Sequence, residues 1–426
     1  MNSETIFALS SGRPPAAVSV IRISGPRAHE AGVRLARTLP EPRHAAVRIL
    51  RDDMGELLDE ALVLRFDGPH SSTGEDVVEL HCHGGRAIVD AVLLALRGLD
   101  GLRDALPGEF TRRAFESGRI DLTEAEGLAD LLEAETETQR KAALALAEGR
   151  LKRIVEDWQA RLLGLSARAE AAIDYADEDD VGSDPSLSDD CGVLAAELGA
   201  WLDRPRVEPL KDGVRIVVAG PPNSGKSSLI NAIAGQEKAI VTDVPGTTRD
   251  HIEVPLSIRG VPVLLTDTAG LRESEERVER IGIERARNLA QSADVLLWLG
   301  DPEDAPVHDR RILVHSRSDL AERFDVPGDS LAVSSVTGAG LRELLSEASR
   351  LATEVLPGEG EVAFNRRHAS HVIEAREALQ RVVAVEDLEL AAEDLRLARS
   401  AFDRLTGRAG VEDVLDALFG RFCLGK

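Results

Sequence analysis

A glycine-rich loop between a short apolar run and a helix-like segment constrains the fold of this chain more than any other feature. The run Val214–Ala219 leads into Gly220–Ser227, which has the spacing G-x-x-x-x-G-K-[ST], and then into the helix-like Ser228–Ile233. Glycines let the backbone wrap an anion, and a helix N-terminus adds unpaired N–H groups. There Lys226 reaches the β- and γ-phosphates and Ser227 is placed to ligate Mg²⁺. The sequence therefore predicts a P-loop α/β domain that binds a nucleoside triphosphate, with Lys226 as a candidate catalytic residue.

The composition of the chain is that of a globular protein rather than of a membrane or nucleic-acid-coating protein. The chain has 426 residues, 43% of them hydrophobic, and a formal net charge of −24. Such acidity argues against binding nucleic acid by bulk electrostatics, but it permits a local basic groove. No apolar run approaches the length of a membrane span, and the first residues lack a targeting pattern. Three widely spaced cysteines, Cys82, Cys191 and Cys423, make a disulfide framework improbable, so a cytoplasmic protein without a membrane segment is expected.

The order of predicted elements divides the chain into several domains. Residues 1–118 have the pattern of mixed strands and helices, and residues 212–355 alternate strands with helices as a P-loop domain does. Helical periodicity runs through 119–211 and returns in 356–426. Because the second helical stretch is too small to form a strong core alone, we expect the two stretches to pack together around an inserted nucleotide domain. The predicted fold is a multi-domain α/β chain with an α+β N-terminal domain, a helical central domain and an inserted Ras-like P-loop domain.

Two further elements follow the P-loop in the order found in GTPases. The segment Thr242–Asp250 contains threonines that can close on Mg²⁺ and the γ-phosphate, among them Thr248 as the Mg²⁺ ligand. A second apolar strand then ends in Asp267–Gly270, which supplies a carboxylate near Mg²⁺ and a glycine N–H that senses the γ-phosphate. The predicted nucleotide-binding residues are Asn223, Ser224, Gly225, Lys226, Ser227, Ser228, Thr242, Asp243, Val244, Pro245, Gly246, Thr247, Thr248, Asp267, Thr268, Ala269, Gly270 and Asp319.

The base-reading end of the predicted pocket departs from the usual GTPase pattern. Where the motif N-K-x-D is expected, the chain has Ser316-Arg317-Ser318-Asp319, and the later S-A-K element is replaced by Ser334-Ser335-Val336. The Asp319 carboxylate can still accept two N–H bonds from guanine, which adenine does not offer. Only Gly300–Arg310 separates two predicted parallel strands, which is too short for the usual crossover helix. We expect guanine preference to persist through Asp319, with weakened affinity and a lost or reduced helix.

Motifs along nearly the whole chain resemble the tRNA modification GTPase family MnmE, also called TrmE. The resemblance is carried by Gly246–Asp250, Asp267–Arg272, Val278–Glu284, Pro107–Phe115 and the terminal Phe422–Lys426. It implies that residues 1–118 dimerise and bind a formyl-tetrahydrofolate, and that the chain forms a homodimer. It also implies work with an FAD-binding subunit of the MnmG type on tRNA, installing a carboxymethylaminomethyl or aminomethyl group at carbon 5 of the wobble uridine.

The resemblance also implies roles for particular side chains. Glu279 matches the catalytic glutamate of the family. The K⁺ ligands of the family match Asn223, Thr242, Val244 and Thr247, and K⁺ there would offset charge that develops on the phosphates. The 5-formyl-tetrahydrofolate site matches Arg22, Glu79, Arg119 and Lys426. Cationic side chains suit the glutamate tail of a folate, and a carboxylate suits its pterin N–H edge.

Two other interpretations of the chain remain open from the sequence. A ribosome-assembly GTPase would share the P-loop and Asp267–Gly270, but it does not account for Pro107–Phe115 or Phe422–Lys426. A folate-binding structural module with a slow nucleotide domain would agree with the altered base motif.

Three smaller features of the sequence give weaker signals. The arginine pairs Arg112-Arg113 and Arg366-Arg367 are candidates for RNA contacts. A strand end is favoured over a metal site at His81–His83. Cys423 is expected to pack as a small hydrophobe rather than to react.

Overall fold

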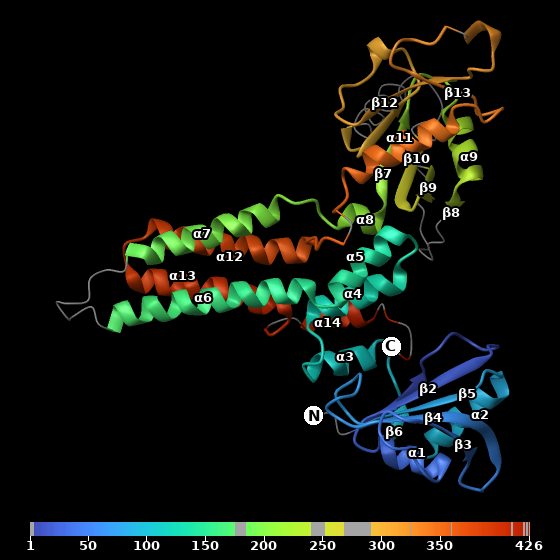
Figure 1. The fold of residues 1–426 in the computed structure, drawn as a ribbon, viewed down its shortest axis with the longest axis vertical. Helices are drawn as coiled ribbons and strands as arrows, with labels where there is room; N and C mark the ends of the chain where they lie inside the picture. Colours follow the sequence, from blue (N-terminus) through green and yellow to red (C-terminus); the bar gives the residue numbers. More distant parts are fainter. Residues whose placement is uncertain are drawn as a thin grey trace, which may run out of the picture. The chain divides into compact units, whose positions relative to one another are not determined.

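The computed structural model describes residues 4–174, 185–239, 252–267, 291–323, 325–358, 360–409, 412–420, 422 and 425. The chain forms two compact units, one of Met1–Ala129 with Asp403–Lys426 and one of Asp130–Phe402 (Figure 1). The boundary between them falls within α4, Leu122–Glu133, and α13, Leu388–Thr406. No helix in the described part of the chain is long and apolar enough to cross a membrane.

The first unit is built on a six-stranded sheet with the order β3-β4-β5-β2-β1-β6. Only β1 and β6 pair in parallel, and the other neighbours are antiparallel. The strands are β1 Thr5–Leu9, β2 Val18–Ser24, β3 Ala45–Arg51, β4 Leu57–Phe66, β5 Val77–His83 and β6 Leu102–Asp104. Buried and partly exposed residues alternate along β5, which leaves one face of the sheet for a core and the other for polar side chains.

Helices on the two faces of this sheet have different roles. Helices α1, Ala28–Ala36, and α2, Arg86–Arg97, close the main core, in which Phe7, Leu80 and Leu96 are fully buried. On the other face, Phe110 of α3, Glu109–Glu116, packs with Ile6 and Ala8. The helix α14, Glu412–Phe419, joins α4 in a third cluster that includes Leu122, Phe419 and Phe422. The open part of the polar face is therefore bordered by α3.

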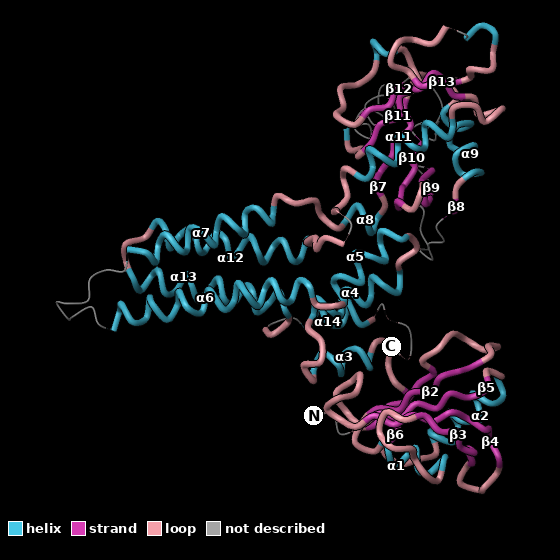
Figure 2. The backbone as a smooth tube through the Cα atoms, viewed as in Figure 1, coloured by secondary structure: helices cyan, strands magenta, loops and turns pink. Residues whose placement is uncertain are grey.

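The second unit contains a seven-stranded sheet with the order β13-β12-β11-β7-β10-β9-β8, seen as magenta strands in Figure 2. The first five strands in this order are parallel, and β9 and β8 extend the sheet antiparallel. The strands are β7 Val214–Ala219, β8 Lys238–Ala239, β9 Ile252–Ile258, β10 Val261–Asp267, β11 Val295–Trp298, β12 Arg311–Ser316 and β13 Leu331–Val333. Helices α9, Lys226–Gln236, and α11, Leu341–Thr353, pack on the core side chains of β7. This arrangement confirms the predicted Ras-like P-loop sheet.

The connection from β11 to β12 has the form expected from its length. The two strands pair in parallel, and between them lies a single 3-10 turn, Pro302–Asp304, in place of a crossover helix. A second such turn, Ala321–Arg323, follows β12. The predicted loss of this helix is therefore confirmed.

The helical part of the second unit is assembled from segments on both sides of the nucleotide domain (Figure 1). Helices α5, Glu137–Ala147, α6, Arg150–Asp174, α7, Pro185–Leu202, and α8, Glu208–Asp212, precede the sheet, and α12, Arg366–Ala384, follows it. Trp158 of α6 lies within 5.8 Å, ring centre to ring centre, of Trp201 on α7 and of Phe402 on α13. This shared aromatic core confirms that the nucleotide domain is inserted into one helical body.

Two hydrogen bonds connect segments at the junction of the helical body and the nucleotide domain. The Val207 N–H before α8 donates to the Phe364 carbonyl before α12, at 3.1 Å. The Thr138 hydroxyl of α5 donates to the carbonyl of Gly260, in the turn between β9 and β10, at 2.9 Å. The second bond attaches the turn of the hairpin whose strand β10 ends at Asp267.

Candidate nucleotide-binding site

The loop between β7 and α9 has the backbone conformation that a phosphate cradle requires. Gly220 and Gly225 have φ angles of +152° and +97°, which L-amino acids with a side chain rarely adopt. Between them Asn223 lies in the left-handed region at φ +59°, a conformation that asparagine tolerates better than most residues. Gly225 precedes the first residue of α9, so the free N–H groups of that helix begin at the loop.

Lys226 is the first residue of α9, and its side chain is 7% exposed. Its ammonium donates to the carbonyls of Gly220 at 3.0 Å and Pro221 at 2.8 Å. These bonds hold the ammonium at the loop rather than in solvent. A buried charge is costly unless it is hydrogen-bonded, and these carbonyls satisfy two of its three donors. The lysine predicted to contact the phosphates is therefore positioned by the loop itself.

The two predicted magnesium-site groups that the structure describes lie together. Ser227 Oγ donates to Asp267 Oδ2 at 2.8 Å, and Asp267 is 2% exposed at the end of β10. Strand β10 pairs with β7 so that Asp267 lies opposite Val218, near the start of the loop. A hydroxyl and a carboxylate are the hard oxygen groups that Mg²⁺ prefers, so the residues present fit this ion.

At the base-reading end, Ser316 connects the loop after β12 directly to the P-loop. Its hydroxyl donates to the Ser224 carbonyl at 2.6 Å, and Ser316 is 4% exposed. The next residue, Arg317, has a left-handed φ of +58°. A Cβ placed on Gly225 would lie 3.7 Å from Arg317 Nε, which shows that the arginine runs beside the loop. The altered motif therefore still connects the loop after β12, at the base end, to the P-loop, at the phosphate end.

The residue predicted to read guanine is held by a buried serine. Ser334 Oγ donates to Asp319 Oδ1 at 2.5 Å, and Ser334 is fully buried. The same oxygen accepts the N–H groups of Val336 at 3.3 Å and Thr337 at 3.1 Å. The first residue of the altered S-A-K element therefore both orients Asp319 and orders the loop after β13.

Several predicted site residues lie outside the described part of the chain. They are Thr242, Asp243, Val244, Pro245, Gly246, Thr247, Thr248, Thr268, Ala269, Gly270, Glu279 and Lys426. Cys423 and the acidic segment 177–184 also lie there. Of the four predicted K⁺ ligands, the structure therefore places Asn223 alone.

On the polar face of the first sheet, two of the predicted folate residues form one cluster. Arg22 of β2 and Glu79 of β5 are register partners, and the Arg22 Nη2 to Glu79 Oε1 distance is 2.8 Å. His81 Nε2 lies 3.3 Å from the other Glu79 oxygen, so both carboxylate oxygens have a partner. The Arg22 guanidinium also lies 5.7 Å from the centre of the Phe110 ring. The sequence did not point to His81 as a partner of Glu79, although two residues apart on one strand they share a face.

The other predicted folate residue that the structure describes lies beside the loop before β5. A Cβ on Gly74 would lie 3.3 Å from Arg119 Cγ. Arg119 follows α3, and its N–H donates to the Ala114 carbonyl at 2.8 Å. The described contacts do not include one between Arg119 and the pair formed by Arg22 and Glu79. The predicted folate set is therefore brought together only in part.

One candidate RNA contact is wrong. Arg113 is 2% exposed, and its guanidinium bonds Glu75 at 2.9 Å and Glu109 at 3.1 Å inside the first unit. A buried, carboxylate-paired arginine is unable to meet a polyanion. Its neighbour Arg112 is half-buried and is paired with Glu116 and Asp416. The spacing Phe110, Arg113, Ala114 on one helix was the signal for burial that the sequence offered.

The His81–His83 segment ends strand β5, as expected. Cys82 is buried between the two histidines, and burial raises the pKa of its thiol to about 12. His83 Nδ1 lies 2.7 Å from Asp59 Oδ1, a structural pair at the strand end. Among the described residues, one His–Asp–Asp group with metal-like spacing occurs elsewhere, at His29, Asp67 and Asp76.

Taken with the sheet order, this loop, its lysine and the Ser227–Asp267 pair define a P-loop GTP hydrolase of Ras-like fold. Two family models match the chain, "MnmE helical domain" over residues 122–423 and "GTP-binding protein TrmE N-terminus" over residues 5–119. The chain belongs to the MnmE family of tRNA modification GTPases.

Curated relatives match the chain along its whole length. A tRNA modification GTPase MnmE from Erythrobacter litoralis is 53% identical over 425 residues, which cover 99% of this chain and 100% of the relative. The protein of that name from Novosphingobium aromaticivorans is 52% identical over 442 residues and covers 100% of both chains. The match from Rhizorhabdus wittichii is 54% identical over 429 residues, with 100% and 97% covered.

Among solved structures, the G domain of the T. maritima FeoB iron transporter aligns with 33% of this chain and 98% of its own length. The identity is 26% and the TM-score 0.24. A TM-score this low supports no statement about the fold, which rests on the strand order above.

Proposed function

We propose that this chain hydrolyses GTP in the modification of carbon 5 of the tRNA wobble uridine; its relatives are named tRNA modification GTPases. The observation that carries the proposal is the intact phosphate end, Lys226 held by the P-loop and Ser227 paired with Asp267, in a chain 53% identical to a tRNA modification GTPase. In this proposal it acts with an FAD-binding subunit of the MnmG type. The proposed compartment is the cytoplasm, where GTP and tRNA are present.

In the proposed mechanism the P-loop residues bind and orient the triphosphate. Lys226, already aimed by two loop carbonyls, places its charge against the β- and γ-phosphate oxygens. Ser227 and Asp267 would hold Mg²⁺, directly and through its water ligands respectively, and Thr248 is the proposed third residue. Bound Mg²⁺ supplies charge that offsets the build-up on the phosphates during transfer. Glu279 is the proposed residue that orients the attacking water.

A potassium ion is proposed beside the P-loop, held by Asn223 with oxygens of Thr242, Val244 and Thr247. The resemblance to the family supports this assignment; the φ of +59° at Asn223 is one that asparagine also adopts in ordinary turns. A cation at this place stabilises charge between the β- and γ-phosphates.

Guanine is the proposed base because Asp319 keeps its place after β12, oriented by Ser334. Its carboxylate accepts two N–H groups from guanine, a pattern that adenine lacks. Ser316 and Arg317 replace the usual amide and lysine.

The proposed folate site uses Arg22, Glu79, Arg119 and Lys426 on the polar face of the first sheet, with residues 1–118 as the folate and dimerisation domain. The other proposed domains are the first helical segment, 119–211, the nucleotide domain, 212–355, and the second helical segment, 356–426. Exposed apolar side chains on β3, an edge strand of the first sheet, support a homodimer, among them Val47 at 56% and Ile49 at 49%. The proposed donor is 5-formyl-tetrahydrofolate or a related one-carbon folate.

The proposal is tested by GTP hydrolysis in matched KCl and NaCl, with ATP as competitor. Faster hydrolysis in KCl and weak competition by ATP are expected. Asn223→Gly keeps the left-handed backbone but removes the amide, so it should abolish the difference between the salts. Equal rates of the wild-type protein in both salts would refute the potassium site, and strong competition by ATP would refute guanine selection. For the folate site, equal binding of 5-formyl-tetrahydrofolate by wild type and a variant lacking Lys426 would refute that residue's role.

The link to tRNA needs its own test in cells. A strain lacking this chain should lose the carbon-5 group of the wobble uridine, as measured by mass spectrometry of digested tRNA. The wild-type gene should restore the group and a Lys226→Ala gene should not. Full modification in the deleted strain would refute the proposed function.

A further inference from the structure

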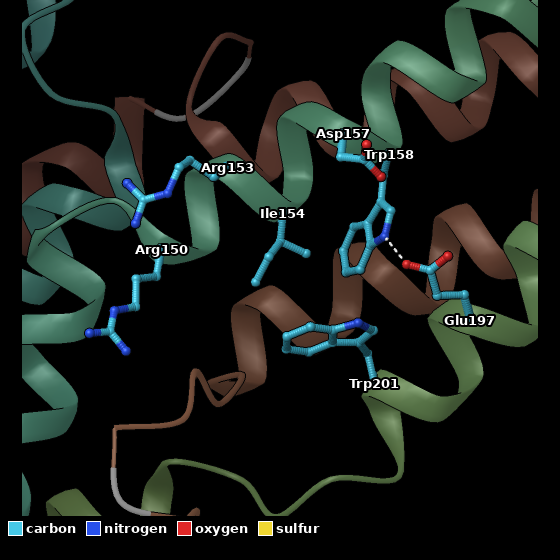
Figure 3. A pocket seen from close by; sticks show the side chains of 7 residues that line it. All are labelled: Arg150, Arg153, Ile154, Asp157, Trp158, Glu197 and Trp201. Atoms are coloured by element: carbon cyan, nitrogen blue, oxygen red, sulfur yellow. Dashed lines mark hydrogen bonds between the residues drawn. The ribbon is translucent and has the colours of Figure 1, made fainter.

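A pocket of about 430 Å³ opens between α6 and α7 in the helical body, away from the P-loop (Figure 3). Its walls are Trp158 and Trp201, whose rings belong to the aromatic core, with Ile154 between them. The remaining lining side chains are Arg150, Arg153, Asp157 and Glu197. The pocket therefore combines an apolar wall with four ionisable groups.

The acidic end of this pocket is partly neutralised within the protein. Glu197 accepts from Trp158 Nε1 at 2.8 Å and from Arg161 at 2.5 Å. Burial raises the pKa of Glu197, but the bonds from Arg161 and Trp158 outweigh it and lower the pKa below its usual value. Arg161 also lies 3.7 Å from Asp157. Arg161 is therefore a cation that the two carboxylates share.

The basic end is not neutralised in this way. Arg150 donates to the Gly360 carbonyl at 2.9 Å and lies 3.9 Å from the Glu148 carboxylate, too far for a hydrogen bond. Arg153 donates to the Glu148 carbonyl at 3.0 Å, and within the described residues it makes no ion pair. Backbone carbonyls orient both guanidinium groups, and the carboxylate nearest to them, Glu148, forms only a long, solvent-exposed ion pair with Arg150. In Figure 3 the two arginines extend to one side of the pocket, opposite Glu197.

The local sequence strengthens this positive end. Helix α6 begins Arg150-Leu151-Lys152-Arg153, with no acidic residue in its first turn. Cations at a helix N-terminus oppose the helix dipole, so this position is unfavourable for them unless an anion binds there. Arg204, after α7, adds a guanidinium 3.7 Å from the centre of the Trp201 ring. In a chain of net charge −24, where carboxylates outnumber cations, a group of arginines with so few carboxylate partners is a candidate anion site.

We propose that this pocket binds a phosphate group of tRNA, with Arg150 and Arg153 as the phosphate ligands and Trp201 as the wall beside them. Guanidinium groups bind phosphate oxygens with paired, charge-assisted hydrogen bonds. The chemistry is that of any phosphate, but the tRNA backbone is the source that the proposed function supplies, so this inference rests on that function. It gives the acidic chain the local basic site that RNA binding needs.

The test compares binding of a tRNA with a wobble uridine by the full-length wild-type protein and the variant R150Q/R153Q, over a range of KCl concentrations. Each phosphate contact contributes about 0.7–0.9 to the slope of log K against log salt, so two lost contacts should reduce the slope by about 1.5. Affinity near 0.1 M salt should fall roughly tenfold. The matched control R381Q/R396Q removes the same charge from arginines that have carboxylate partners, Asp394 and Glu393. It should bind tRNA as the wild type does.

Each other outcome overturns the inference in a distinguishable way. Equal binding by wild type and R150Q/R153Q, or equal loss in R381Q/R396Q, refutes the pocket and leaves the proposed function intact. Failure of the wild-type protein to bind tRNA refutes both. If inorganic phosphate raises the melting temperature of the wild type but not of R150Q/R153Q, while tRNA binding is equal, the site takes free phosphate and not RNA. GTP hydrolysis and melting temperature report folding, and Arg153→Gln alone replaces the double variant if the latter unfolds.

Discussion

Replacing Ser334 by alanine gives the sharpest test of how this protein selects guanine. The Ser334 hydroxyl donates to Asp319 at 2.5 Å from a fully buried position. It also accepts the backbone N–H groups of Val336 and Thr337. The substitution deletes the orienting bond to Asp319 and leaves both N–H groups without this acceptor, while changing little volume.

The expected magnitude follows from the charge on the acceptor. A hydrogen bond to a charged group contributes about 1.5–3 kcal/mol, and 1.4 kcal/mol is a factor of ten in affinity. Affinity for GDP should therefore fall roughly 10- to 100-fold. Inosine diphosphate lacks the amino group that Asp319 reads, so its binding already depends less on that carboxylate and should fall less.

Isothermal titration of GDP and inosine diphosphate provides the measurement. Ser335→Ala is the control, because Ser335 is the next residue and no hydrogen bond of its side chain is found among the described residues. It should bind both nucleotides as the wild type does. Equal losses for the two nucleotides in Ser334→Ala would show that the serine acts on loop order alone. No loss for either would refute the role of Ser334 in positioning Asp319.

Three further results are expected. Burial raises the thiol pKa of Cys82 to about 12 and of Cys191 to about 11, so site-resolved iodoacetamide labelling at pH 8 should find both unreactive until urea is added; labelling in the native protein would contradict this. Burial raises the pKa of Glu109, but bonds from Arg103, the Leu106 N–H and Arg113 lower it overall, so its stabilisation is present above the unfolded pKa of about 4.3 and is lost as pH falls through the folded value. Glu109→Gln should then lower the free energy of unfolding by about 1–3 kcal/mol at pH 7. In urea denaturation at a series of pH values, the variant should lose less stability than the wild type as the pH falls below about 5. The same loss in both proteins would contradict this role of Glu109. Lys226→Ala should abolish GTP hydrolysis while the circular dichroism melt is kept, and a rate within tenfold of the wild type would be incompatible with its role.

The phosphate end of the site was predictable because its chemistry is contiguous in the sequence. Gly220, Lys226 and Ser227 lie within eight residues, and a strand before them with a helix after them fixes their geometry. The short connection Gly300–Arg310 was equally readable, since its length alone excludes a crossover helix. Both the P-loop geometry and the missing crossover helix could therefore be predicted from spacing within a short stretch of sequence.

Contacts between distant segments were not predictable in the same way. Ser316 and Ser224 are 92 residues apart in the sequence, and Asp319 follows β12 whereas Ser334 follows β13. No local sequence pattern therefore predicts either hydrogen bond. Arg113 was misassigned because an arginine pair looks solvated in sequence. On a helix, adjacent residues point about 100° apart, so one member of the pair faced the core.

The residues that replace the usual base-reading motif keep the hydrogen bonds between the loop after β12, the P-loop and the loop after β13. A serine is shorter than the asparagine usual at its position, yet Ser316 reaches the Ser224 carbonyl at 2.6 Å. That carbonyl belongs to the loop that also orients Lys226, so the β12 loop and the P-loop remain one hydrogen-bonded unit. Asp319 takes its orientation from the other side, through Ser334. The altered motif therefore keeps both connections, and under the proposed role of Asp319 guanine selection would depend on a single carboxylate held by a single hydroxyl.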